Sequence, residues 1–379
     1  MTGSVTSSTH PPHPTPSEDD LFSQLRLLRS RRVGVATYRR LLSEHGTARD
    51  ALLALPGVAR AAGVPDYTVC PEGVIEAELR AGARLGATLI SEASPAYPTA
   101  LRDLDDAPPL LWLMGDPSLL KRPMIALVGA RNASSLGTRM TKRLAADLSK
   151  AGFVIVSGLA RGIDAAAHSA ALDGGTVAVQ AGGVDVIYPV ENTALARDIA
   201  ARGLRLSEMP IGLQPQARHF PVRNRLISGL ARATVVVEAA AKSGSLITAR
   251  NALDQNREVL AVPGHPFDAR ATGCNMLIRD GATLVRSAED VITAIAPISK
   301  PAPLFHKATP PAAPPRKPLR EVARLHSEIL SRLGPAPIAE DQLIRDLALN
   351  ANAVAPALLD LELEGKISRQ PGGLLAKLV

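Results

Sequence analysis

A strand–loop–helix unit occurs twice in residues 124–164, whose sequence is MIALVGARNASSLGTRMTKRLAADLSKAGFVIVSGLARGID. In the first unit the apolar run 124–128 predicts a buried strand, and residues 135–150 predict the helix that follows it. The second unit repeats the pattern, with an apolar run at 154–156 and a helix predicted over 164–172. Buried strands that alternate with helices are typical of a parallel sheet covered on both faces, so we predict an α/β, extended Rossmann-like core.

The same alternation continues towards the C-terminus. Further strands are predicted at 176–179, 204–207, 234–237 and 259–262, and further helices at 191–202, 245–255 and 273–280. We therefore assign residues 111–296 to the core.

The segments before the core differ from it in composition. Residues 1–18 are rich in Pro, Ser and Thr, which predicts a disordered tail. Residues 19–110 are predicted to form a small helical domain, because Leu21, Leu25 and Leu28 recur at helical spacing. Within it, LPGV at 55–58 is compatible with the turn of a helix-hairpin-helix motif, which can present N–H groups to phosphates, and equally with a plain helical corner.

The segments after the core predict a linker and a second small domain. Residues 297–318 are Pro-rich, so we expect an extended, semi-rigid linker. Residues 319–379 predict three helices and a hairpin around PGG at 371–373, which is the winged-helix pattern. Its third helix ends in Glu362-Leu363-Glu364, which would repel a phosphate backbone, so contact with protein and contact with DNA both remain open.

Composition limits the class of protein. Hydrophobic residues make up 46% and aromatic residues only 3%, so an aliphatic core is expected. Lys and Arg outnumber Asp and Glu by 43 to 36, which suits a polyanionic partner without requiring one. The two cysteines, Cys70 and Cys274, can build neither a disulfide framework nor a zinc cluster. With no signal peptide and no apolar run that could span a bilayer, we expect a cytoplasmic protein without membrane contact.

Two loops after predicted strands combine small residues with a cation. GARNAS at 129–134 leads into a helix, so its N–H groups and the helix N-terminus can attract a phosphate that Arg131 contacts. It lacks the G-x-G-x-x-G spacing of a dinucleotide site. SGLARGID at 157–164 has the same design with Arg161, and Asp164 is expected to cap its helix rather than to catalyse.

Two further loops add an aromatic ring and more cations. In HFPVRNRLI at 219–227, Phe220 can stack on a base while the arginines pair with phosphates. The alternative places Phe220 in the core and the arginines on a solvated helix face. In KSGSLIT at 242–248 the Gly-Lys-Ser/Thr end of a Walker A loop is missing, so we expect no ATP hydrolysis.

All four loops follow strands of the same predicted parallel sheet. Ligands of such sheets bind outside the carboxyl ends of the strands, so the loops should converge on one edge. A mononucleotide would need one or two of them, whereas a single-stranded nucleic acid, with one charge per nucleotide, could use them all. We therefore predict a long groove of N–H donors and cations.

At these loops the sequence resembles the DprA/Smf family of DNA-processing proteins. The resemblance is carried by segments 129–134, 157–164, 220–230 and 244–248, by Pro263-Gly264, and by the lead-in from Tyr97-Pro98 to Gly115. It implies a single-stranded DNA-binding protein, not an enzyme, that protects incoming DNA and helps to load the RecA recombinase in natural transformation. It also implies a homodimer that needs no cofactor and no metal. The nucleic-acid-binding candidates are Gly129, Arg131, Ser134, Ser157, Gly158, Arg161, Phe220, Arg223, Arg225, Lys242, Gly244, Ser245 and Thr248, with Asn224 and Arg225 as the two that could instead be structural.

Two other classes of function are less well supported by the residues. A nucleotide-processing enzyme of the phosphoribohydrolase group would carry a Gly-Gly-x-Gly-Thr loop with a Glu soon after it, and SGSLIT at 243–248 has neither. The three histidines His168, His219 and His265 lie in separate segments and are expected to be structural. A transcription factor that reads DNA through the winged helix is disfavoured by the acidic third helix.

Overall fold

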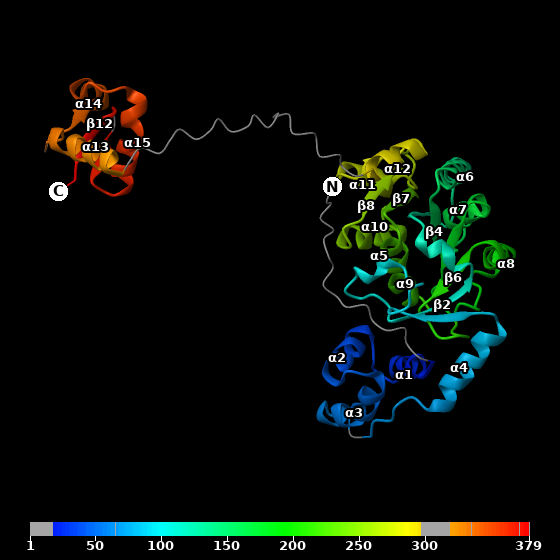
Figure 1. Cartoon of the computed structure of the whole chain (residues 1–379). Helices are drawn as coiled ribbons and strands as arrows, with labels where there is room; N and C mark the ends of the chain where they lie inside the picture. The colour runs from blue at the N-terminus through cyan, green and yellow to red at the C-terminus, as the bar shows by residue number, and fades with distance from the viewer. Residues whose placement is uncertain (1–17, 65, 297–318, 335, 371, 379) are drawn as a thin grey trace, which may run out of the picture. The chain divides into compact units, whose positions relative to one another are not determined.

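The computed structural model describes residues 18–64, 66–296, 319–334, 336–370 and 372–378. The tail and the linker predicted at 1–18 and 297–318 lie outside the described residues, apart from residue 18. The chain divides into two compact units, residues 1–297 and 298–379 (Figure 1). The larger unit contains the predicted core.

Within the described residues, one sheet of nine strands runs through the larger unit, in the spatial order β1-β2-β6-β5-β4-β3-β7-β8-β9. The strands are β1 Thr88–Ser91, β2 Leu110–Gly115, β3 Met124–Gly129, β4 Val154–Ser157, β5 Thr176–Val179, β6 Leu204–Ser207, β7 Ala233–Glu238, β8 Glu258–Ala261 and β9 Thr283–Leu284. In this spatial order, every neighbouring pair between β6 and β9 is parallel. At the other edge, β2 pairs antiparallel with both β1 and β6. The predicted parallel core is confirmed, inside a sheet that is mixed as a whole.

Helices cover both faces of this sheet. Alternate residues of a strand point to opposite faces, and β3 sends Ile125 and Leu127 to one face and Ala126 and Val128 to the other. The first pair packs among α6 (Ser135–Lys150), α7 (Ile163–Ala171) and α12 (Ala288–Ile295). The second pair packs among α5 (Thr99–Arg102), α9 (His219–Leu230), α10 (Ser245–Asp254) and α11 (Thr272–Arg279). The remaining elements of the core are α8 (Thr193–Arg202) and the 3-10 turns η1 (Pro117–Lys121) and η2 (Val190–Asn192).

The N-terminal helices are α1 (Glu18–Arg29), α2 (Val35–His45), α3 (Ala48–Ala61) and α4 (Glu72–Arg84). The turn expected at 55–58 is wrong, because α3 continues through Pro56. Leu52, Leu55 and Ala59 are all buried on one face of α3, and this packing outweighs the lost hydrogen bond at the proline. The helix ends instead at Ala61, and the turn after it contains Gly63, whose φ of 80° favours glycine.

The border between the helical domain and the core also differs from the prediction. Residues 19–110 were expected to be helical throughout, but β1 lies inside this range and extends the core sheet through β2. The strand has only four residues, too few for a clear alternating pattern. The sheet therefore begins at Thr88.

The smaller unit has the predicted winged-helix topology. It contains α13 (Leu319–Arg332), α14 (Glu340–Leu347) and α15 (Ala351–Leu363), with a three-stranded sheet of β10 (Ile338–Ala339), β11 (Ile367–Gln370) and β12 (Leu374–Lys377). One apolar cluster, which includes Leu343, Leu358 and Leu375, holds the helices on the sheet. None of the helices in the described part of either unit is long and apolar enough to cross a membrane.

Candidate nucleic-acid interface

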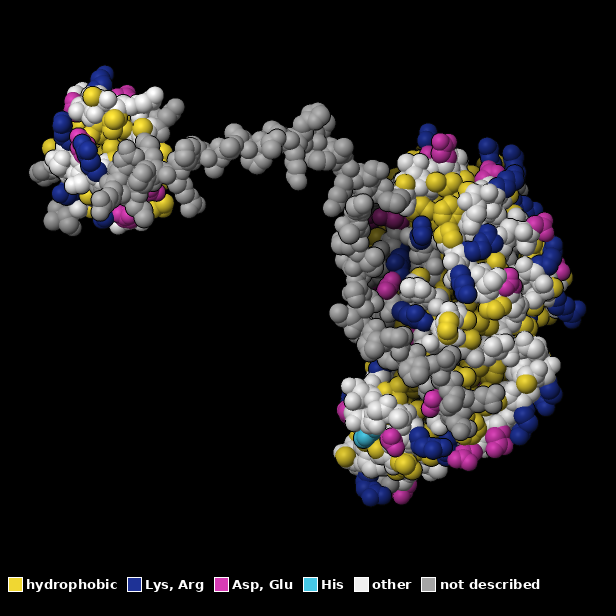
Figure 2. Space-filling view, in the orientation of Figure 1, with side chains coloured by type: hydrophobic (Ala, Val, Ile, Leu, Met, Phe, Trp, Pro, Cys, Tyr) yellow, Lys and Arg dark blue, Asp and Glu magenta, His cyan; other side chains and the backbone are white. Residues whose placement is uncertain are grey.

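An open cavity of about 910 Å³ lies at the carboxyl ends of the parallel strands. We call it the trough. All four predicted segments reach it, together with residues from the loops after β5, β6 and β8. The loop predicted at 219–227 is wrong, because these residues form the first turns of α9, and their side chains rather than a loop backbone face the trough. Its lining includes Gly129, Arg131, Asn132, Ala160, Asp164, Tyr188, Pro215, Ala217, Phe220, Arg223, Asn224, Lys242, Ser243, Gly244, Ser245, Thr248 and Arg270. In the space-filling view, Lys and Arg side chains stand among apolar ones on the visible face of the larger unit (Figure 2).

An aromatic pair forms one wall of the trough. The ring centroids of Phe220 and Tyr188 are 5.6 Å apart at an interplanar angle of 49°. The Cζ atom of Arg131 lies 5.3 Å from the Phe220 ring centroid, within the range of a cation–π contact. A side cavity of about 300 Å³, which we count as part of the trough, adjoins this wall and is lined by Arg161 and Glu191. The wall thus joins flat apolar surface to guanidinium groups, which suits bases and phosphates together.

Three predicted cations are exposed at the trough. Arg131 and Lys242 are exposed, and no ion pair within the described residues involves either of them. The Arg161 side chain is 61% exposed and lies 3.8 Å from the Glu191 carboxylate, which is itself exposed. A surface pair of this kind contributes little free energy, so Arg161 remains available to a phosphate.

Arg223, in contrast, is an internal residue. It is 5% exposed, and its Nη1 donates to the carbonyl of Val179 at 2.8 Å. A Cβ at position 158 would lie 1.8 Å from that nitrogen, so the guanidinium packs directly against Gly158. Burial lowers the pKa of Arg223 to about 10, although the neighbouring Asp164 carboxylate opposes the shift. Arg223 therefore shapes the floor of the trough rather than extending from it.

The capping role expected for Asp164 is wrong, because the N-cap of α7 is Gly162 and Asp164 lies inside the helix. Its side chain instead holds the loop 157–164 together from inside. Its Oδ2 accepts the N–H groups of Gly158 at 3.1 Å and Ala160 at 3.3 Å. Burial raises the pKa of Asp164, while the Arg223 guanidinium acts in the opposite direction. The N–H of Leu159 donates to His168 Nε2. Three amides that were expected to face phosphates are therefore used internally, and this loop contributes to the trough through Arg161 instead.

The loop 129–134 keeps more of its predicted donors. Ala130 N–H donates to the carbonyl of Glu238, but the N–H groups of residues 131–133 have no acceptor among the described residues. Ser134 caps α6, since its Oγ accepts the N–H of Gly137 and its own N–H donates to Glu238 Oε2 at 2.8 Å. The Glu238 carboxylate thus occupies the N-terminus of α6, where related sheets bind a nucleotide phosphate.

The remaining predicted residues serve the scaffold. The Ser157 hydroxyl is buried and donates to the carbonyl of Leu127, and Ser245 and Thr248 are buried at the start of α10. Arg225 lies between the carboxylates of Glu208 at 2.6 Å and Asp106 at 3.2 Å, which is the structural role considered for it from the sequence.

Comparison with known proteins identifies the family. Residues 88–296 match the family described as DNA recombination-mediator protein A, flanked by a match to the DprA-like N-terminal HHH domain at 18–81 and to the DprA winged helix domain at 309–373. Protein Smf of Synechocystis sp. is 36% identical over 306 residues, which cover 73% of this chain and 77% of that protein. The chain belongs to the DNA recombination-mediator protein A family. The resemblance to DprA/Smf proteins noted in the sequence is confirmed.

Two other members of this DprA/Smf family, both with solved structures, share the fold. DNA processing protein A from Streptococcus pneumoniae aligns with a TM-score of 0.61 and 34% identity, covering 74% of this chain and 98% of that one. DNA processing protein A from Helicobacter pylori, whose structure is described as revealing a unique single-stranded DNA binding mode, aligns with a TM-score of 0.52 and 31% identity, covering 56% and 97%. DNA processing protein DprA of Bacillus subtilis is 46% identical over 209 residues, covering 54% of this chain and 70% of that protein.

Three trough residues of this DprA/Smf protein were missed in the sequence. Tyr188 lies in the loop after β5, which contains Gly182 and Gly183 but no Lys or Arg, and Asn132 lies in the first predicted loop but was not selected as a contact. Arg270 follows β8 beside an aspartate with which it forms an ion pair. A usable signal existed for Tyr188, since aromatic residues are rare in this chain and this one lies in the loop that follows a predicted strand.

His168 makes the stability of the larger unit depend on pH. Burial lowers its pKa from 6.5 to about 3, so the folded ring stays neutral while the unfolded chain binds a proton near pH 6.5. The free energy of unfolding should therefore fall as the pH drops from 6.5 towards 3, by up to about 5 kcal/mol from this group. Urea unfolding at pH 7.5, 6 and 5 should show a steeper loss for the wild type than for His168→Gln. If the free energy of unfolding fell equally with pH in both proteins, another group would control the loss of stability in acid.

Proposed function

We propose that the trough binds single-stranded DNA through Arg131, Arg161, Phe220 and Lys242, with amides from residues 131–133. The observation that supports this most directly is the Arg131 guanidinium over the Phe220 ring, at the mouth of an open cavity of about 910 Å³. The cations neutralise phosphates, and the ring offers a stacking face that any base can use. These residues come from four separate segments, more than one mononucleotide needs.

The same geometry favours an unpaired strand over a duplex. Stacking on Phe220 and Tyr188 needs a base whose face is free, whereas in a duplex the faces are covered by neighbouring bases. Asn132 and Asn224 also reach the trough and can hydrogen-bond to bases or sugars. We infer that affinity depends strongly on salt and only weakly on base sequence.

We propose that the protein has no turnover of its own. Asp164 is buried and accepts two backbone N–H groups, so it is poorly placed as a general acid or base. The N-terminus of α6 is filled by Glu238, which leaves no room there for a nucleotide phosphate. These features count against a phosphoribohydrolase-like enzyme.

We further propose that the protein acts as a homodimer that protects the bound strand and helps to load a RecA-type recombinase. The mediator role follows the family description as DNA recombination-mediator protein A, and the homodimer and the protection of the strand follow the resemblance noted in the sequence. The winged-helix module suits contact with protein better than contact with DNA. Helix α15 carries no Lys or Arg, bears Asp360 and Glu362, and exposes Leu359 and Leu363 by 55% and 78%.

Replacing Phe220 with alanine tests the stacking face. The substitution should weaken binding of a single-stranded oligonucleotide by about 1–3 kcal/mol, because one stacked base loses its partner. Phe267→Ala is the matched control, since Phe267 is 94% exposed and lies outside the trough lining. Fluorescence anisotropy over a range of salt, with single- and double-stranded probes, measures both variants. Equal affinity of Phe220→Ala and wild type for the single strand would exclude this stacking role.

A further inference from the structure

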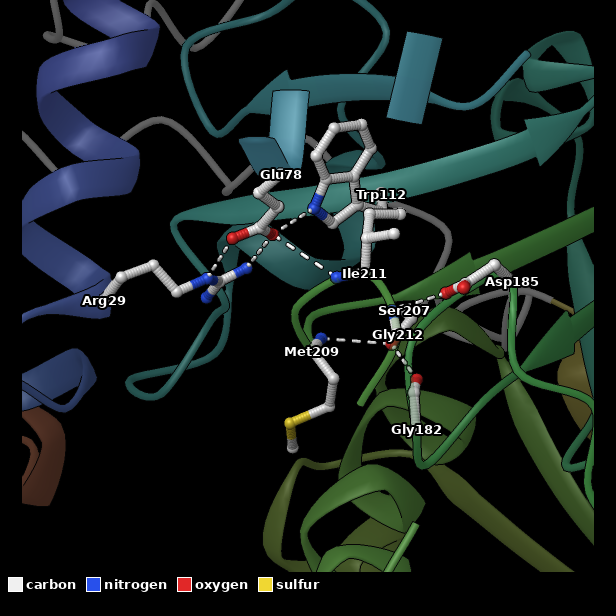
Figure 3. A network of polar contacts seen from close by, with 9 residues as sticks. All are labelled: Arg29, Glu78, Trp112, Gly182, Asp185, Ser207, Met209, Ile211 and Gly212. Atoms are coloured by element: carbon white, nitrogen blue, oxygen red, sulfur yellow. Dashed lines mark hydrogen bonds and ion pairs between the residues drawn. The ribbon is translucent and has the colours of Figure 1, made fainter. Parts of the chain in front are cut away.

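The carboxylate of Glu78 collects hydrogen bonds from three separate parts of the chain (Figure 3). Arg29 on α1 donates to both of its oxygens, at 2.9 and 2.8 Å. Trp112 on β2 donates its indole N–H to Oε1 at 2.9 Å, and the backbone N–H of Ile211 approaches the same oxygen at 3.4 Å. The Glu78 side chain is 8% exposed and that of Arg29 15%, so the cluster is largely shielded from water.

Ile211 belongs to the segment 208–218, which leaves β6 and leads into α9. This segment carries Pro215 and Ala217 into the trough lining, directly before Phe220. Glu78 therefore holds one end of a stretch whose other end forms the trough wall. The carboxylate is therefore a polar link between the helical N-terminal part of the chain and the candidate DNA site, beside the apolar cluster in which Ile211 packs with Leu79 and Trp112.

The same segment is tied to the loop that carries Tyr188. The N–H of Gly212 donates to Asp185 Oδ1 at 2.9 Å, and the N–H of Gly183 donates to the carbonyl of Leu213 at 2.9 Å. The Ser207 hydroxyl links the bases of the two loops, donating to the carbonyl of Gly182 and accepting the N–H of Met209 (Figure 3). Displacement of segment 208–218 would therefore disturb both residues of the aromatic wall.

On the basis of the proposed function, we propose that Glu78 is a positioning residue for single-stranded DNA binding, which orders the Tyr188–Phe220 wall through Ile211 and Gly212. Its negative charge is held in place by Arg29, and a buried carboxylate with such a partner has one favoured orientation. Ligand binding is weakened when the competent arrangement is only partly populated. The N-terminal helices thus set the affinity of the trough without contacting DNA.

The only tryptophan of the chain reports on this cluster. The sequence contains one Trp, and its indole N–H donates to the carboxylate oxygen that Ile211 also approaches. Binding of a single strand against the aromatic wall should shift segment 208–218 slightly and change the emission of Trp112. If Glu78 only stabilised the fold, the emission of Trp112 would not change when DNA binds.

The test compares Glu78→Gln with Glu76→Gln in the full chain. Glu76 lies on the same helix and pairs only with exposed Arg80, so its substitution is a matched loss of charge. If Glu78→Gln leaves the wall ordered in about a tenth of the molecules, the dissociation constant for an unlabelled dT oligonucleotide rises about tenfold. In Glu78→Gln the DNA-dependent change in Trp112 emission should disappear, and the backbone amides within residues 211–217 should exchange hydrogen faster. Glu76→Gln should match the wild type in all three measurements.

Two further variants keep the result decisive. Arg131→Ala should lose affinity while leaving exchange at amides 211–217 unchanged, and its failure to do so would remove the trough hypothesis itself. Where Arg131→Ala weakens binding but Glu78→Gln does not, only the positioning role is overturned. If Glu78→Gln does not fold, Asp185→Ala releases Gly212 from the other side and should give the same tenfold loss. Unchanged affinity in that variant overturns the proposal.

Discussion

Replacing Arg131 and Arg161 together with alanine is expected to weaken single-stranded DNA binding about a hundredfold at low salt. Each guanidinium is exposed at the trough and can form charge-assisted bonds with a phosphate, worth at least about 1.5 kcal/mol each. Arg131 also loses its place over the Phe220 ring. The slope of log affinity against log salt should shrink by about 1.4, since about 0.7 is lost per single-strand phosphate contact.

A second pair of arginines separates site chemistry from overall charge. Arg49 and Arg60 are exposed on α3, so their double replacement removes the same two charges far along the chain from the trough loops. Anisotropy titrations at several salt concentrations should show nearly wild-type affinity for that control. A similar loss in both double variants would mean that net charge, rather than the trough, controls binding.

The substitution Gly158→Ala is expected to lower the free energy of unfolding by about 3 kcal/mol or more. The new Cβ would lie 1.8 Å from Nη1 of Arg223 and 2.5 Å from its Cζ, so the guanidinium has to leave its present position. Displacing it would break its bond to the Val179 carbonyl and leave a buried charge poorly paired. Urea unfolding measures the loss.

Gly244→Ala is the matched control in the opposite loop of the trough. Nothing lies within 4 Å of a Cβ built at Gly244, and its φ of −61° suits any residue. Its free energy of unfolding should stay within about 1 kcal/mol of the wild type. Equal stability of the two alanine variants would show that Arg223 relocates freely and is not part of a rigid floor.

Helical periodicity could have predicted that Arg223 is buried, whereas the arginines of the other predicted segments are exposed. Arg223 precedes Leu226, Ile227 and Leu230 by three, four and seven positions, which places it on the buried face of α9. Judged by local composition alone, Arg223 looked equivalent to Arg131 and Arg161, whereas a structural role was already considered for Arg225. Their different exposure follows from the helix face for Arg223 and from two acidic partners for Arg225.

The strands and the convergence of their loops could be predicted because both follow from local patterns. Apolar runs such as 124–128 identify buried strands, and parallel order then brings their carboxyl ends to one edge. The use of each amide could not be predicted, because it depends on side chains distant in sequence. The Glu238 carboxylate accepts the N–H of Ser134, which lies 104 residues away in the sequence, so no local pattern predicts this hydrogen bond.

The carboxylate of Glu238 at the start of α6 has a consequence for competition inside a cell. Free ATP, NAD and their relatives are abundant polyphosphates, and a vacant helix terminus in this fold would attract them. Here the protein supplies its own anion at that point, bonded to Ser134 and pressed against Gly137. We therefore expect small polyphosphates to bind weakly at this point, while a long polymer can still lie across the surrounding cations.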